Sequence, residues 1–124
     1  MLKLTLYGAP VTKKNSGQIW INQKTNKPFI APSKAYKAYE KDCGRQITGD
    51  KKQHIDVSIN LKCVYYMPNR RKVDLCNLLG ATCDILVKFG VIADDNSKIV
   101  QSHDGSRVLT DKANPRVEIE IEEA

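Results

Sequence analysis

Residues 70–100 read RRKVDLCNLLGATCDILVKFGVIADDNSKIV, and this stretch decides how the rest of the chain can be organised. Apolar side chains recur in it at spacings of three and four, which predicts an amphipathic helix over residues 74–89. Asp74 is expected at the N-cap or in the first turn, and Gly90 is expected to stop the helix. Charged residues flank the helix: Arg70, Arg71 and Lys72 before it, and Asp94 and Asp95 after it.

The predicted helix has a polar face. At 100° per residue its members span about 80°; they are Asp74, Asn77, Ala81, Asp84 and Lys88. Asp74 and Asn77 therefore point in roughly the same direction, away from the core. Asp74 can serve as a helix cap or as a metal ligand. Asp84 could be a further ligand, but its place ten residues into the helix favours a solvated or salt-bridged residue.

Working outward from this helix, the remaining elements alternate between period-two and helical patterns. They are a strand over 2–8, a hairpin of 18–22 and 28–32, a helix from Ser33 to about Thr48, a strand over 54–67, a strand over 97–103 that returns through an Asp104-Gly105 turn to 106–110, and a terminal strand over 116–122. The prediction is one domain, 1–124, of the α/β (α+β) class, with a mixed, mostly antiparallel sheet packed against two main helices.

The composition excludes several protein classes. With 41% apolar and 27% charged residues among 124, the chain is typical of a soluble globular domain. No apolar run approaches the roughly 18 residues of a membrane span and the N-terminus does not resemble a signal peptide, so we expect a cytoplasmic protein. The four cysteines form no C-x-x-C pair and are expected to be free thiols, with Cys63 and Cys83 packed as small apolar residues.

The charge is unevenly distributed along the chain. Residues 1–73 hold 15 Lys/Arg against 4 Asp/Glu, and residues 74–124 hold 5 against 10, so a basic part precedes an acidic part. This distribution suits an anion-binding surface around a metal site, although a solvated basic surface would look the same. The candidates for phosphate contacts are Lys13, Lys14, Arg70, Arg71 and Lys72.

Carboxylates beside a run of cations suit a magnesium-dependent enzyme that acts on a polyanion, because Mg²⁺ takes oxygen ligands and phosphates attract Lys and Arg. Asp94 and Asp95 can also be explained as turn formers. A helix of about sixteen residues is about 24 Å long. Asp74 and Asp94 can therefore meet only if the chain returns along a short or curved helix, or if a second subunit contributes.

The segments Asp74-Leu75-Cys76-Asn77-Leu78, Asp84-Ile85-Leu86 and Asp94-Asp95 together resemble the RusA family of Holliday-junction resolvases, which is common in bacteriophages and prophages. The early Gly8–Lys14 segment is similar to the Gly/Pro/Lys loop of that family. The similarity spans most of the chain.

The resemblance implies a small homodimer that cuts four-way DNA junctions with Mg²⁺, for which Mn²⁺ can substitute, held by aspartates. Carried over by position, Asp74 and Asp95 match catalytic metal-binding acids, with Asp94 and Asn77 assisting. The chain departs from the family motif at two places. The second acid of D-x-D-N falls on Cys76, a soft ligand that suits Mg²⁺ poorly, and a lysine of several members falls on Gly80.

The leading hypothesis is therefore a Mg²⁺-dependent endodeoxyribonuclease that resolves Holliday junctions by paired nicks in DNA recombination and repair, in the cytoplasm of a bacterial host and associated with the nucleoid. The alternative is a catalytically weakened or inactive junction-binding protein of the same fold, with Cys76 as the cause. A basic RNA-binding domain is a third interpretation, against which the Asp94-Asp95 pair argues.

Overall fold

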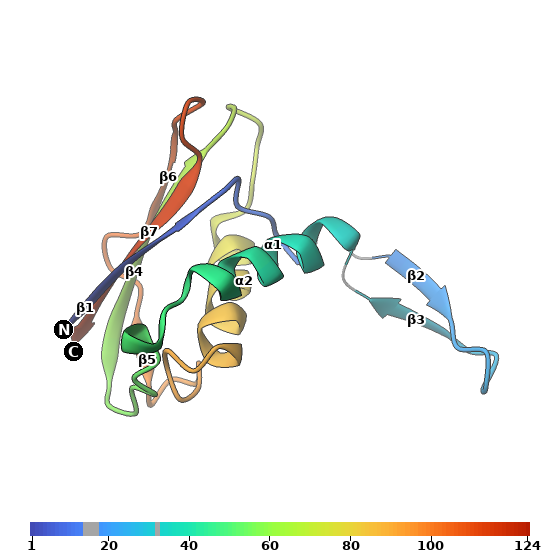
Figure 1. Cartoon of the computed structure of the whole chain (residues 1–124), viewed down its shortest axis with the longest axis horizontal. Helices are drawn as coiled ribbons and strands as arrows, with labels where there is room; N and C mark the ends of the chain where they lie inside the picture. Colours follow the sequence, from blue (N-terminus) through green and yellow to red (C-terminus); the bar gives the residue numbers. More distant parts are fainter. Residues whose placement is uncertain (14–17, 32) are drawn as a thin grey trace.

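The computed structural model describes residues 1–13, 18–31 and 33–124 and contains one main sheet with two helices on one of its faces (Figure 1). Three long strands make up most of the sheet: β1 (Leu2–Tyr7) at one edge, then β7 (Arg116–Glu123) and β4 (Ile59–Met67), paired antiparallel in that order. Strict alternation in these strands places every second side chain on the helix-covered face, where it is buried. The predicted first and last strands are thus confirmed.

Two short strands complete the sheet at the β4 edge, and here one prediction is wrong. β5 (Val100–Ser102) and β6 (Arg107–Thr110) both pair parallel with β4, so the Asp104-Gly105 turn does not make a hairpin. The chain bulges outward between them and then continues in the same direction. Asn60 of β4 stabilises this bulge, because its side chain bonds both the backbone N–H (2.8 Å) and the carbonyl (3.2 Å) of Asp104.

The strand predicted over 54–67 begins later than expected, at Ile59. The preceding residues do alternate, but their backbone groups pair with the loop that follows the second helix. The His54 N–H donates to the Gly90 carbonyl (2.9 Å), the Ile55 N–H donates to the Val91 carbonyl (3.1 Å), and Val57 is exposed. This pairing holds the loop after the second helix against the body of the protein.

Both predicted helices are present. α1 (Lys34–Gln46) starts at Ser33, whose side chain caps the Tyr36 N–H, and α2 (Leu75–Lys88) starts at Asp74. Their apolar stripes are buried against the sheet as predicted: Tyr36, Tyr39, Cys43 and Ile47 from the first, and Leu78, Leu79, Thr82, Ile85 and Leu86 from the second. A 3-10 turn (Gly49–Lys51) follows α1. The buried Tyr65 hydroxyl is satisfied by Thr82 of α2 at 2.6 Å.

The predicted hairpin of β2 (Gln18–Ile21) and β3 (Pro28–Ala31) forms a separate two-stranded sheet. Figure 1 shows it projecting from the body beyond the start of α1. All four cysteines are free, and Cys63 and Cys83 are buried as predicted. Among the described residues, no helix is both long and apolar enough to cross a membrane.

Candidate functional site

The start of α2 is held by Asp74. Its Oδ1 accepts a hydrogen bond from the Cys76 N–H at 2.9 Å, and its carbonyl accepts from Leu78 at 3.1 Å. The cap function that the sequence allowed is therefore present. Oδ1 is used by the cap, whereas no hydrogen bond to Oδ2 is seen within the part of the chain that is described, and the side chain is exposed.

The chain reverses direction immediately after α2. Gly90 adopts φ +78°, which favours glycine, and a Cβ there would lie 2.8 Å from Nε2 of His54. The Val91 N–H then donates to the Leu86 carbonyl (2.8 Å), and the Ala93 N–H donates to the Ile55 carbonyl (2.9 Å). These contacts direct the following acidic pair back along the helix, so no second subunit is needed to bring a carboxylate of this pair to α2.

Within the pair, the two acids differ in what they contact. Oδ1 of Asp94 accepts from the Asp95 N–H (2.7 Å) and Oδ2 accepts from the Asn96 side chain (3.0 Å). These hydrogen bonds, the one from the Asp95 amide first, lower the pKa of the Asp94 carboxyl. Asp94 thus stabilises the turn, while Asp95 forms no ion pair with any residue that the structure describes.

Asp95 lies against α2 at a hollow of about 170 Å³, which we call the carboxylate pocket. Its lining residues are Lys13, Cys76, Asn77, Gly80, Ala81, Asp84 and Asp95. Nζ of Lys13 lies 3.6 Å from Oδ2 of Asp84. The pKa of the neighbouring Cys83 thiol is raised to about 12, first by burial and then by the negative charges of Asp95 and Asp84. Two carboxylates therefore converge on one side of the helix.

The predicted site residues divide into two groups. Asn77, Asp95 and Lys13 line the carboxylate pocket, whereas Asp74 and Asp94 are not among its lining residues. Asp84 forms the salt bridge that was expected of it, but it also contributes the second carboxylate of the pocket. The sequence held a signal for this second role of Asp84, because the predicted polar face of the helix groups Asp84 with Asn77 and Ala81.

The basic segment before α2 lies next to this pocket. Arg70, Arg71 and Lys72 are exposed, and the last two line a second hollow of about 300 Å³. Thr12 lines this basic hollow and Lys13 lines the carboxylate pocket, so consecutive residues join the two. Lys14, the remaining candidate for phosphate contact, lies outside the described residues.

The donor set of the carboxylate pocket suits a hard, hydrated divalent cation. Asp84, Asp95 and Asn77 offer oxygen atoms, and Mg²⁺ is usually bound through one or two carboxylates while it keeps several waters. No three His, Cys, Asp or Glu side chains are grouped closely enough to hold an ion, among the residues whose placement is described. The two carboxylates and the amide oxygen fit a cation that keeps several waters.

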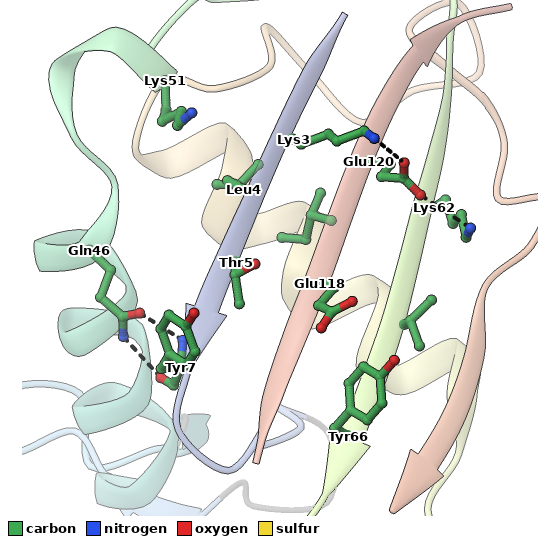
Figure 2. Close-up of a pocket in the computed structure, with 12 residues that line it drawn as sticks. Lys3, Leu4, Thr5, Tyr7, Gln46, Lys51, Lys62, Tyr66, Glu118 and Glu120 are labelled. Carbon is green, nitrogen blue, oxygen red and sulfur yellow. Dashed lines mark hydrogen bonds and ion pairs between the residues drawn. The ribbon is translucent and has the colours of Figure 1, made fainter. Parts of the chain in front are cut away.

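A larger hollow, of about 680 Å³, lies on the face of the sheet away from the helices (Figure 2). Its charges neutralise one another: Glu120 bonds Lys3 at 3.2 Å and Lys62 at 3.1 Å. Arg116 binds Glu118 and its guanidinium lies 3.9 Å from the Tyr66 ring centroid. The smaller pocket is the better candidate site, because it holds Asp95, which has no ion pair among the described residues, and because it lies beside the basic hollow.

Comparisons with known proteins identify the family of the chain. The model of the family described as "Endodeoxyribonuclease RusA" matches residues 8–122. A relative named "Crossover junction endodeoxyribonuclease RusA", from Aquifex aeolicus (strain VF5), is 34% identical over 99 residues, which cover 77% of this chain and 72% of the relative. The matched range includes the loop that carries Lys13, the basic segment and the whole carboxylate pocket.

Proposed function

The chain belongs to the RusA family of endodeoxyribonucleases, and we propose that it resolves four-way DNA junctions by paired nicks, with Mg²⁺ or Mn²⁺ bound at the carboxylate pocket. The observation that carries the proposal is the convergence of Asp84 and Asp95 beside the basic hollow. A DNA substrate would place its action at the nucleoid, in the cytoplasm of a bacterial host, whether the gene belongs to the host or to a phage.

Asp95 and Asp84 would hold the cation, with Asn77 assisting through its amide oxygen. Asp74 remains a predicted ligand through Oδ2, and Asp94 supports Asp95 by ordering the turn. A divalent cation at this position supplies Lewis acidity, which activates water and stabilises the negative charge that develops on the attacked phosphate. Arg70, Arg71 and Lys72 would bind the flanking backbone without reading sequence, and thereby position the phosphate over the pocket.

We further propose that the active form is a homodimer. A four-way junction presents two equivalent strands, and a two-fold dimer presents two equivalent sites. The projecting β2–β3 hairpin supports this proposal, because an isolated two-stranded hairpin is at best marginally stable in water. Packing against a second copy would provide the hairpin with contacts that the main sheet does not provide.

One feature favours the alternative of a junction-binding protein with weak catalysis. Cys76 is exposed and lines the carboxylate pocket in the first turn of α2, where the family motif has an acid. A thiol there contributes no hard oxygen ligand, so cation affinity would be lower than with an aspartate.

The test is cleavage of an end-labelled synthetic four-way junction with Mg²⁺, compared with EDTA and with the Asp95→Asn variant. Glu120→Gln on the open sheet face is the matched control, because it makes the same carboxylate-to-amide change away from the pocket. Symmetric nicks that are lost with EDTA and in Asp95→Asn, but retained in Glu120→Gln, support the nuclease. Tight junction binding without nicks, in Mg²⁺ and in Mn²⁺, supports the binding protein.

A further inference from the structure

We propose that Lys13 is an exchangeable counter-ion of the carboxylate pocket: it neutralises Asp84 when no divalent cation is present and moves to the substrate phosphate when a cation enters. This inference rests on the proposed function, since it concerns the same pocket. It assigns Lys13 a role different from that of a simple backbone contact.

The position of Lys13 carries the first step. It comes from the loop after β1, yet its ammonium reaches α2 and lies 3.6 Å from Oδ2 of Asp84. Within the described part of the chain it is the only cation that lines the pocket, against the two carboxylates of Asp84 and Asp95. One positive charge therefore occupies the space that a divalent cation would need, and it compensates only half of the negative charge.

The pair has the properties of a contact that can exchange. Both side chains are about half exposed, at 48% for Lys13 and 45% for Asp84, and exposed ion pairs of this kind are weak. The contrast is Arg116, whose side chain is 17% exposed and lies 2.8 Å from its acidic partners. A divalent cation, with twice the charge, can displace the ammonium of Lys13 from an exposed pair such as Lys13–Asp84.

There is also space for the exchange. A Cβ on Gly80, which lines the same pocket, would meet nothing within 4 Å, so this side of α2 is open where the ammonium must give way. Thr12, the preceding residue, already lines the basic hollow beside Arg71 and Lys72. A displaced Lys13 therefore stays within the strip where the DNA backbone is expected, and its charge can reach the attacked phosphate.

The experiment is a titration of DNA-free protein with Mn²⁺, in which electron paramagnetic resonance measures free Mn²⁺. Lys13→Met should bind Mn²⁺ about fivefold more tightly than wild type, the scale set by the loss of one exposed ion pair. Lys3→Met, which removes the same charge on the open sheet face, should not differ from wild type, and Asp84→Asn should bind more weakly. In junction cleavage with saturating Mn²⁺, Lys13→Met should be slower and Lys13→Arg close to wild type.

Unchanged or weaker Mn²⁺ binding by Lys13→Met, with its thermal midpoint equal to that of wild type, would overturn the exchange. Reduced junction affinity alone, without tighter Mn²⁺ binding, would likewise refute it and make Lys13 an ordinary backbone contact. The nuclease proposal is read separately, from cleavage by the wild-type protein. Tighter Mn²⁺ binding in a protein that does not cut would support the exchange and reject the nuclease.

Discussion

The open face of the sheet and the carboxylate pocket differ in how their charges are compensated. On the open face of the sheet, Glu120 lies between Lys3 and Lys62, and Arg116 is bonded by Asp111 and Glu118. In the carboxylate pocket, two aspartates face one half-exposed lysine, Lys13, among the described residues. The open face has the larger hollow, yet its charges need no ligand, whereas the pocket carries uncompensated negative charge that a cation would stabilise.

Incomplete charge compensation indicates a site better than the size of a hollow does. Ion pairs among exposed side chains contribute little to stability, so the network on the open face needs no functional explanation. Carboxylates that converge without full compensation repel each other, and a fold tolerates this arrangement more readily where a cation binds. Substitutions in the pocket should therefore affect cleavage more than substitutions on the open face.

Asp95→Asn should have the largest effect. It removes the carboxylate that lies in the pocket without an ion pair among the described residues, so cleavage should fall by at least about 100-fold, the scale on which one group that acts in the transition state is felt. The thermal midpoint should not fall, because Asp95 is exposed. Initial rates on a labelled junction and a melting curve measure the two quantities. Retained cleavage would exclude Asp95 as a ligand.

Asp74 should show a divided effect. Asparagine is as good an N-cap as aspartate, whereas alanine costs about 1 kcal/mol. We expect Asp74→Asn to slow cleavage by about tenfold or more at unchanged stability, and Asp74→Ala to lose both activity and stability. Denaturant unfolding combined with cleavage rates distinguishes the roles. Full activity in Asp74→Asn would leave Asp74 with its cap function only.

Cys76→Asp should strengthen the pocket. The substitution places a hard oxygen ligand on the helix turn that already carries Asn77, so Mg²⁺ should bind about tenfold more tightly and cleavage should rise. Calorimetric titration and cleavage at limiting Mg²⁺ measure this. An unchanged Mg²⁺ affinity would mean that residue 76 is too far from the cation to contribute.

Arg71→Ala should weaken junction binding by a few-fold at moderate salt, and the dependence of log K on log salt should become less steep by about one unit, as expected for one phosphate contact. Lys52→Ala is a suitable control, because Lys52 is an exposed lysine outside both hollows. Equal salt slopes for Arg71→Ala and wild type would remove Arg71 from the DNA-binding surface.

Glu120→Gln should have the smallest effect, and only on acid stability. Hydrogen bonds from Lys62 and Lys3 lower the pKa of Glu120 below its ordinary value of 4.5. Its contribution is therefore present above pH 4.5 and is lost as the pH falls through the lowered pKa. The midpoint of Glu120→Gln should lie slightly below that of wild type at neutral pH and converge with it in acid. Slower cleavage in this variant would connect the open face to function.

Local patterns predicted most of the fold, and non-local hydrogen bonds explain the failures. The apolar stripes of both helices and the alternation of the terminal strand were sufficient to predict these elements, because their apolar faces are buried against one core. The Asp104-Gly105 turn looked like a hairpin, but Asn60, more than forty residues earlier, holds it as an outward bulge. No local signal reports such a contact.

The candidate site was predicted only in part, because its assembly also depends on a non-local contact. The polar face of α2 and the acidic pair were visible in the sequence. Asn77 and Asp95, which were both predicted as ligands, line one pocket, and their role as ligands stays a prediction. The return of the chain after Gly90 depends on the pairing of Ile55 with the following loop, which the sequence did not reveal. Asp84 was consequently favoured as a solvated or salt-bridged residue over a further ligand.

The most direct test is where Mn²⁺ binds on DNA-free protein, measured by paramagnetic broadening of backbone amide signals in a ¹⁵N-labelled sample. We predict that broadening is strongest at residues 76–84 and 94–96, around the carboxylate pocket. The contradictory result is broadening centred on the hollow lined by Asp104, Glu120 and Glu122, or no selective broadening at all. Either outcome would show that the convergence of Asp84 and Asp95 is not a cation site.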